Sequence, residues 1–109
     1  MCPAAAQPVS GLPELDPVFH QPVRTRLAVL LSQGARSFSQ LKSELQITDG
    51  NLDAHLRKLS AAGYLHSEMV YDGRPRTDYS LSGSGSKAFA GYLRDLHRLM
   101  KAAAIGGRR

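Results

Sequence analysis

Residues 48–63, TDGNLDAHLRKLSAAG, leave few choices of structure, because they have the pattern of a short amphipathic helix. Leu52, Leu56 and Leu59 recur at intervals of four and three residues, so they share one side of a helix and can pack into a core. The opposite side combines small residues, an amide and two cations: Gly50, Asn51, Ala54, Arg57 and Lys58. This pattern suits a helix in a DNA major groove, where small side chains permit close approach, Asn pairs with adenine, and Arg pairs with guanine or phosphate.

Two strand-like runs follow this helix, at residues 64–71 (YLHSEMVY) and 77–81 (TDYSL). Between them lies the segment 72–76, DGRPR. Its Asp-Gly pair predicts a tight turn because glycine tolerates positive φ, and the proline stiffens the returning strand. Arg74 and Arg76 make this turn basic, so a basic hairpin tip follows a basic helix.

Further elements precede the helix of residues 48–62, which Thr48 is placed to cap. An Asp-Pro start predicts a short helix over residues 16–21, and the next proline begins a second helix over residues 22–33. Residues 36–38 are expected to add a small strand to the hairpin, and residues 39–45 (SQLKSEL) to form a helix. The pattern predicts an α+β fold, mostly α: a winged helix-turn-helix with a two- to three-stranded β-wing and a long C-terminal dimerisation helix.

The long final helix starts near Ser82. Gly83 and Gly85 weaken its first turn by roughly 1 kcal/mol each relative to alanine, so we expect that end to fray. Further on, apolar residues recur at intervals of three and four, and in so small a domain this stripe is expected to pair with its copy across a two-fold axis. The predicted dimer interface contains Leu15, Phe19, Phe89, Tyr92, Leu93, Leu96, Leu99 and Met100.

Length and charge narrow the function. A chain of 109 residues is one domain with a marginal core, which we divide into a flexible arm (1–12), a DNA-binding and dimerisation domain (13–105) and a basic tail (106–109). The net charge of +5 favours a polyanionic partner, whether nucleic acid, an acidic protein or a membrane surface. Cys2 alone provides no disulfide framework. Without a long apolar run or a secretory signal, the chain is expected to be cytoplasmic, with no membrane partner.

Four motifs occur together within residues 15–100: PVR at 22–24, NLDAHL at 51–56, AGYL at 62–65 and GRPR at 73–76. In combination they resemble the winged-helix transcriptional regulators related to the MarR and ArsR groups. The resemblance is closest to the small branch that has little more than the DNA-binding domain and a dimerising helix. It implies a homodimeric DNA-binding transcriptional regulator, usually a repressor. One departure is the SGSG run at 82–85, where relatives often have Thr-Pro or Ser-Pro.

The predicted DNA-binding residues lie on the helix-turn-helix and the hairpin tip: Arg24, Ser39, Thr48, Gly50, Asn51, Ala54, His55, Arg57, Lys58, Arg74 and Arg76. Several of them have another interpretation. The cations can simply solvate exposed surfaces, Asn51 can cap its helix, and His55 can be a packing residue. Arg24 is either a phosphate contact or the partner of a nearby carboxylate. Asp53 is placed to orient Arg57 one turn later.

Metal and catalytic sites are not expected. Some ArsR relatives bind zinc-like ions through Asp-x-His plus a second His pair, and Asp95 and His97 match only the first half, because no His or Glu follows. No glycine-rich phosphate loop occurs, and no nucleophile is placed beside a base. We therefore predict no metal, no cofactor and no enzymatic activity.

Three functions remain under consideration. The favoured one is a dimeric repressor that inserts helix 48–62 into the major groove and the 72–76 wing into the minor groove or onto phosphates of a pseudo-palindromic double-stranded DNA operator. The second is a protein-interaction module whose basic face meets an acidic partner. The third is a ligand-responsive sensor, with an unidentified small-molecule effector in a pocket at the dimer interface.

Overall fold

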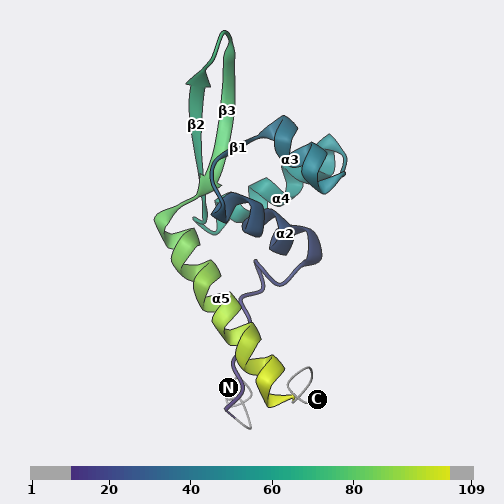
Figure 1. Ribbon diagram of the computed structural model, residues 1–109, viewed down its shortest axis with the longest axis vertical. Coiled ribbons are helices and arrows are strands. Elements are labelled where there is room, and N and C mark those ends of the chain that lie inside the picture. Colours follow the sequence, from purple (N-terminus) through teal and green to yellow (C-terminus); the bar gives the residue numbers. More distant parts are fainter. Residues whose placement is uncertain (1–10, 104–109) are drawn as a thin grey trace.

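The computed structural model describes residues 11–103. Most of the predicted arm (1–12), the last two residues of the predicted domain (13–105) and all of the basic tail (106–109) lie outside the described residues. Helices α2 (Pro22–Ser32), α3 (Phe38–Leu45) and α4 (Asp49–Ala61) form the body of the protein, while a hairpin and helix α5 (Gly83–Ala102) extend from it in opposite directions (Figure 1). None of the described helices is long and apolar enough to cross a bilayer.

The sheet has three antiparallel strands in the order β1–β3–β2. Strands β2 (Leu65–Tyr71) and β3 (Pro75–Leu81) form the hairpin, and the short strand β1 (Arg36–Ser37) pairs with the body end of β3. At the hairpin tip Gly73 has a φ of +84°, which a glycine adopts without strain. The predicted strand after α2 and the predicted hairpin are both confirmed.

Hydrogen bonds from side chains fix where α3 and α4 begin. Ser37 and Gln40 form a capping box at the start of α3, and the Thr48 hydroxyl accepts a hydrogen bond of 3.1 Å from the Asn51 N–H at the start of α4. Gln46 makes the turn between the two helices in a left-handed conformation, with φ at +55°. The helix-turn-helix and its Thr48 cap are therefore confirmed.

One predicted helix is wrong. Residues 16–21 make a single turn, closed by a hydrogen bond of 3.0 Å from the His20 N–H to the Asp16 carbonyl. Gln21 is extended, with φ at −153° and ψ at 130°, because the residue before a proline avoids helical angles. The Asp16 carboxylate instead accepts hydrogen bonds from the Val18 N–H and from the Tyr64 hydroxyl.

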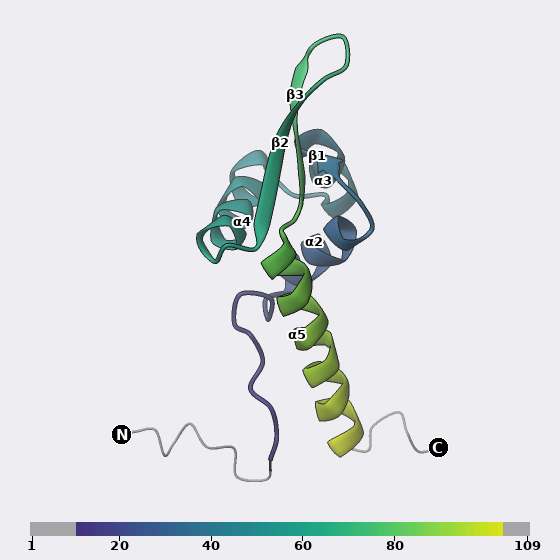
Figure 2. The same cartoon turned by 90° about the vertical axis from the view of Figure 1, so that its left-hand side faces the viewer.

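The core lies between the three body helices and the first half of α5. Phe19 is fully buried at its centre, where its ring stacks on Tyr64 with centroids 5.0 Å apart and contacts Phe89 and Tyr92. The rest of the core is aliphatic: Leu27, Ala28, Leu31, Leu41, Leu45, Leu52, Leu56 and Leu59. In the view turned by 90°, α4 lies on one side of the hairpin and α2 and α3 on the other (Figure 2).

The junction between the hairpin and α5 differs from the expected frayed end. Ser82 caps α5 by accepting a hydrogen bond from the Gly85 N–H, and its hydroxyl donates to the Gly63 carbonyl. Gly85 is buried against the backbone of Tyr64, so close that a Cβ added to it would lie 2.2 Å from the Tyr64 carbonyl oxygen. Gly85 therefore permits close packing of α5 on the segment that joins α4 to β2.

Candidate nucleic-acid interface

Helix α4 presents the two faces that its leucine spacing predicts. Leu52, Leu56 and Leu59 are buried, with at most 4% of any of the three exposed. The residues of the opposite face are all exposed: Gly50, Asn51, Ala54, Arg57 and Lys58. Because this face carries cations and an amide between small residues, it has the composition of a surface that enters a major groove.

Arg57 is held by a carboxylate of its own helix. Its Nε lies 2.9 Å from Oδ2 of Asp53, one turn earlier, while 80% of the Arg57 side chain remains exposed. The predicted orientation of Arg57 by Asp53 is confirmed. An exposed ion pair of this kind adds little stability, so its main effect is on the direction of the guanidinium.

Arg24 and His55, which are 31 residues apart in the chain, meet beside α4. The Arg24 Nε donates a hydrogen bond of 2.6 Å to the Val18 carbonyl, and its Nη1 lies 3.2 Å from Nδ1 of His55. Burial and, second, the positive charge of Arg24 lower the pKa of His55 below its usual 6.5. With Nδ1 accepting from Arg24, neutral His55 carries its proton on Nε2. The carboxylate partner considered for Arg24 is thus replaced by a carbonyl and an imidazole.

This environment predicts a loss of stability in mild acid. Because the pKa of His55 is lower in the folded protein, the unfolded chain takes up this proton at a higher pH than the folded protein does. The contribution of His55 to the free energy of unfolding is therefore complete above pH 6.5 and is lost as the pH falls through the folded pKa. We expect the free energy of unfolding to fall between pH 7.5 and pH 5, and to fall less in His55→Gln. Urea denaturation at both pH values measures this difference, and equal losses in the two proteins would contradict it.

The wing contains two arginines in different situations. Arg76 is held by two carboxylates of the hairpin, with Nε 3.0 Å from Asp78 and Nη1 3.1 Å from Asp72. These hydrogen bonds, the one to Asp78 first, raise the pKa of Arg76. Arg74 is exposed at the tip and forms no ion pair among residues 11–103. The structure thus separates a cation that braces the hairpin from a cation that projects from it.

A lysine that the sequence analysis did not single out lies at the helix-turn-helix turn. Lys42 Nζ is 2.8 Å from Oδ1 of Asp49, which links α3 to the first turn of α4. Lys42 and Ser39 both line a shallow hollow of about 540 Å³ on this side. Their spacing of three residues, which places them on one side of α3, was the signal available in the sequence.

Three residues of the predicted dimer interface belong to the core of a single chain instead. Phe19, Phe89 and Tyr92 are at most 4% exposed, so they have almost no surface to offer a partner. Their placement corrects the predicted list, because the stripe on α5 first closes on its own domain. Leu93 and Met100 are 43% and 53% exposed, and the other three members are half-buried: Leu15, Leu96 and Leu99.

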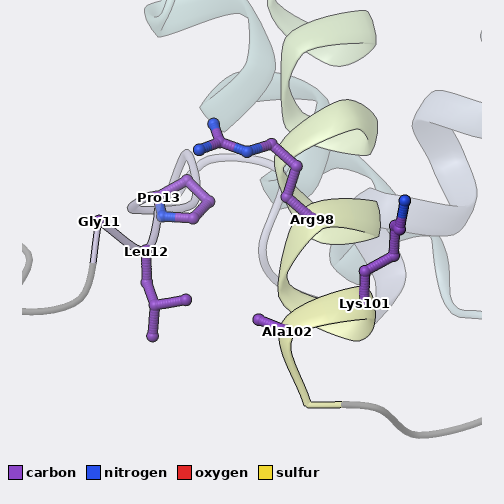
Figure 3. A pocket seen from close by; sticks show the side chains of 6 residues that line it. All are labelled: Gly11, Leu12, Pro13, Arg98, Lys101 and Ala102. Atoms are coloured by element: carbon purple, nitrogen blue, oxygen red, sulfur yellow. The ribbon is translucent and has the colours of Figure 1, made fainter.

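An open hollow of about 340 Å³ lies between segment 11–13 and the last turns of α5 (Figure 3). Arg98 reaches towards Pro13, whereas Lys101 points away from that segment, so the two cations do not converge on one point. Within the described part of the chain, no group of three or more His, Cys, Asp or Glu side chains is placed to hold a metal ion.

The capped helix-turn-helix, the three-stranded sheet and the protruding hairpin define a winged-helix DNA-binding protein. Comparison with known families agrees with this class. The chain belongs to the winged helix DNA-binding domain family, whose model matches residues 23–100.

Relatives and solved structures extend this result. An uncharacterised protein of Methanocaldococcus jannaschii is 35% identical over 86 residues, which cover 77% of this chain and 94% of that protein. The structure of a transcriptional regulator homologue from Pyrococcus horikoshii matches with a TM-score of 0.74 and 29% identity, over 81% of this chain and 89% of the other. A MarR-family transcriptional regulator structure from Enterococcus faecalis matches with a TM-score of 0.73 at 24% identity, over 84% of each chain. The predicted resemblance to small winged-helix regulators is confirmed.

Proposed function

We propose that this protein is a homodimeric transcriptional repressor that binds a pseudo-palindromic operator in double-stranded DNA. In this proposal each subunit inserts α4 into a major groove. The wing of each subunit then reaches the flanking minor groove or its phosphates. Two copies related by a two-fold axis read half-sites that are about one helical turn apart.

The observation that carries the proposal is the open face of α4. Its cations and its amide project from a ridge of small residues, and the buried leucines on the other side hold the helix firmly in the body. The N-terminal capping residue Thr48 and the exposed Ser39 and Asn51 provide further hydrogen-bonding groups at the same end of the helix-turn-helix. Such groups suit contacts to phosphates and base edges.

Within the wing, we assign the DNA contact to Arg74. Arg76 has both its Nε and its Nη1 engaged by Asp78 and Asp72, so moving it onto a phosphate would break two ion pairs and leave two carboxylates near the DNA. Arg74 has no such competition among the described residues. Arg76 is then a brace that shapes the hairpin, and Arg74 is the side chain that meets the duplex.

Dimerisation through α5 is supported by its remaining apolar surface. Leu93 and Met100 are exposed beside the buried apolar stripe of α5. They are seven residues apart, which is the repeat at which paired helices contact each other. Leu93 also borders a groove of about 350 Å³ between α2, β3 and α5, which a second copy can fill. Repression is the proposed output because blocking an operator needs little surface beyond the DNA-binding face.

Selection of bound duplexes from a random-sequence pool, at a stated salt concentration, tests the proposal. We expect the protein to enrich a pseudo-palindrome whose half-sites are centred about 10 base pairs apart. In sedimentation the protein is expected to be a dimer. A pool without enrichment would reject sequence-specific DNA binding.

A variant with Leu93→Glu and Met100→Glu tests whether the spacing of the two half-sites depends on dimerisation through α5. It is expected to sediment as a monomer and to lose the spacing preference, because charged side chains replace the exposed apolar edge of α5. A variant that remains a dimer would place the interface elsewhere, without affecting the assignment of α4.

A further inference from the structure

We propose that Arg57 reads a guanine in each half-site of the operator and that Asp53 is the positioning residue that makes this reading selective. The inference rests on the proposed function, since it concerns which base α4 recognises. In this proposal Arg57 contacts a guanine and not a phosphate, and Asp53 holds Arg57 in position.

The atoms used by the ion pair are the first argument. Asp53 engages the Nε of Arg57, at 2.9 Å, and so leaves the two terminal nitrogens free. Among the described residues, Arg57 forms no ion pair other than the one with Asp53. A guanidinium supported at one edge presents the other as a planar pair of donors, which matches the O6 and N7 acceptors of guanine.

The position of Arg57 on α4 is the second argument. Gly50 and Ala54 precede it by seven and three residues, so they lie on the same face and add almost no bulk around it. A helix with small residues there can approach the base edges closely, and the long side chain of Arg57 then reaches the groove floor. Lys58 and Asn51 share a different edge of the helix, seven residues apart.

The charge of Asp53 is the third argument, because it separates a base contact from a phosphate contact. A carboxylate next to Arg57 repels phosphate oxygens, whereas at a guanine it can face the amino group of a neighbouring cytosine. Holding Arg57 in place before binding also reduces the side-chain entropy that is lost in the complex. Asp53 therefore weakens binding to arbitrary DNA and favours the correct base.

Arg76 shows the contrasting arrangement within the same chain. Its partners occupy Nε and Nη1, one at each position, so only Nη2 is left without an ion-pair contact. Arg57 on α4 therefore keeps an open fork, whereas the fork of Arg76 on the wing is occupied. Of these two ion-paired arginines, Arg57 has the geometry for two parallel hydrogen bonds to one base.

Duplex selection with five proteins tests the inference: the wild type, Arg57→Lys, Asp53→Ala, Asp53→Glu and, as a matched control, Asp95→Ala. Asp95 is also a helix carboxylate paired with an arginine, Arg98, at 3.6 Å, but it lies on α5. Lysine keeps the charge at 57 and can still donate to guanine, but it lacks the planar fork whose two donors fit O6 and N7 together. We expect Arg57→Lys to discriminate that guanine about tenfold less than the wild type does, and to keep its affinity for arbitrary DNA.

Asp53→Ala is expected to bind arbitrary DNA more tightly and to discriminate that guanine less, whereas Asp95→Ala keeps the wild-type preference. Asp53→Glu, which can still reach Arg57, should restore discrimination. Thermal melting confirms that each variant is folded. If the wild type enriches a palindrome and Arg57→Lys retains every base preference at the wild-type strength, the guanine assignment is overturned while DNA binding stands. If Asp53→Ala discriminates as the wild type does, the role of Asp53 is overturned. If the wild type enriches nothing, both proposals fail.

Discussion

Gly85→Ala is expected to lower the free energy of unfolding by about 3 kcal/mol, although alanine is the better helix former by about 1 kcal/mol. The added Cβ would lie 2.2 Å from the carbonyl oxygen of Tyr64 and 2.9 Å from its carbonyl carbon and Cα. All three are backbone atoms, so no side chain can rotate to relieve the overlap. Helix α5 would have to move away from the segment that joins α4 to β2, which would also disturb the hydrogen bonds of Ser82.

Gly83→Ala is the matched control for this prediction. Gly83 is in the same first turn of α5, and a Cβ there meets no atom within 4 Å. This substitution should leave stability unchanged or raise it by up to about 1 kcal/mol. Urea denaturation of both variants measures the contrast. A Gly85→Ala protein as stable as Gly83→Ala would show that the contact between α5 and Tyr64 is looser than described.

The double variant Arg57→Ala with Arg74→Ala is expected to lose at least about 100-fold in operator affinity, or about 3 kcal/mol per binding event. It removes the proposed base reader and the proposed wing contact from both subunits of the proposed dimer. The slope of log affinity against log salt should also become shallower, because fewer counterions are displaced from the DNA. A mobility-shift titration at several salt concentrations gives both quantities.

A variant with Lys87→Ala and Arg94→Ala removes the same number of positive charges from exposed positions on α5. It should keep most of the operator affinity, which separates local contacts from the effect of net charge. Both proteins should melt as the wild type does, since all four side chains are exposed. Equal affinity of the Arg57 and Arg74 double variant and the wild type, at matched salt, would contradict the proposed interface.

Local patterns were enough to predict most of the fold. The leucines of α4, the Asp-Gly turn of the hairpin and the Thr48 cap act over a few residues, and the structure has each of them where the pattern predicts. The turn at residues 16–21 was misjudged because Gln21, before Pro22, is extended and ends the turn. The Asp16 carboxylate caps this turn and also accepts a hydrogen bond from the Tyr64 hydroxyl 48 residues away. Contacts over such distances leave no periodic signal in a sequence.

The sequence predicted which residues make up the candidate site, but not the ion pairs and hydrogen bonds between them. The sequence identified Arg57 and both wing arginines, yet only the structure shows that Arg76 is enclosed by two carboxylates and that Arg24 meets His55. For α5 the error had one cause: a stripe of apolar residues looks the same whether it covers its own core or a partner. Phe89 and Tyr92 cover the core, with Phe19 between them and Tyr64.

The close contact between Gly85 and the Tyr64 backbone has a consequence for regulation. Tyr64 lies three residues after Ala61, the last residue of α4. Ser82 donates hydrogen bonds to the carbonyls of both Gly63 and Tyr64, so α4 and α5 are joined through this short segment. We expect a change in the position of α5 to move α4 with it. In the proposed dimer, a signal that alters α5 would therefore change the angle between the two subunits, and the distance between their two α4 helices would change with it.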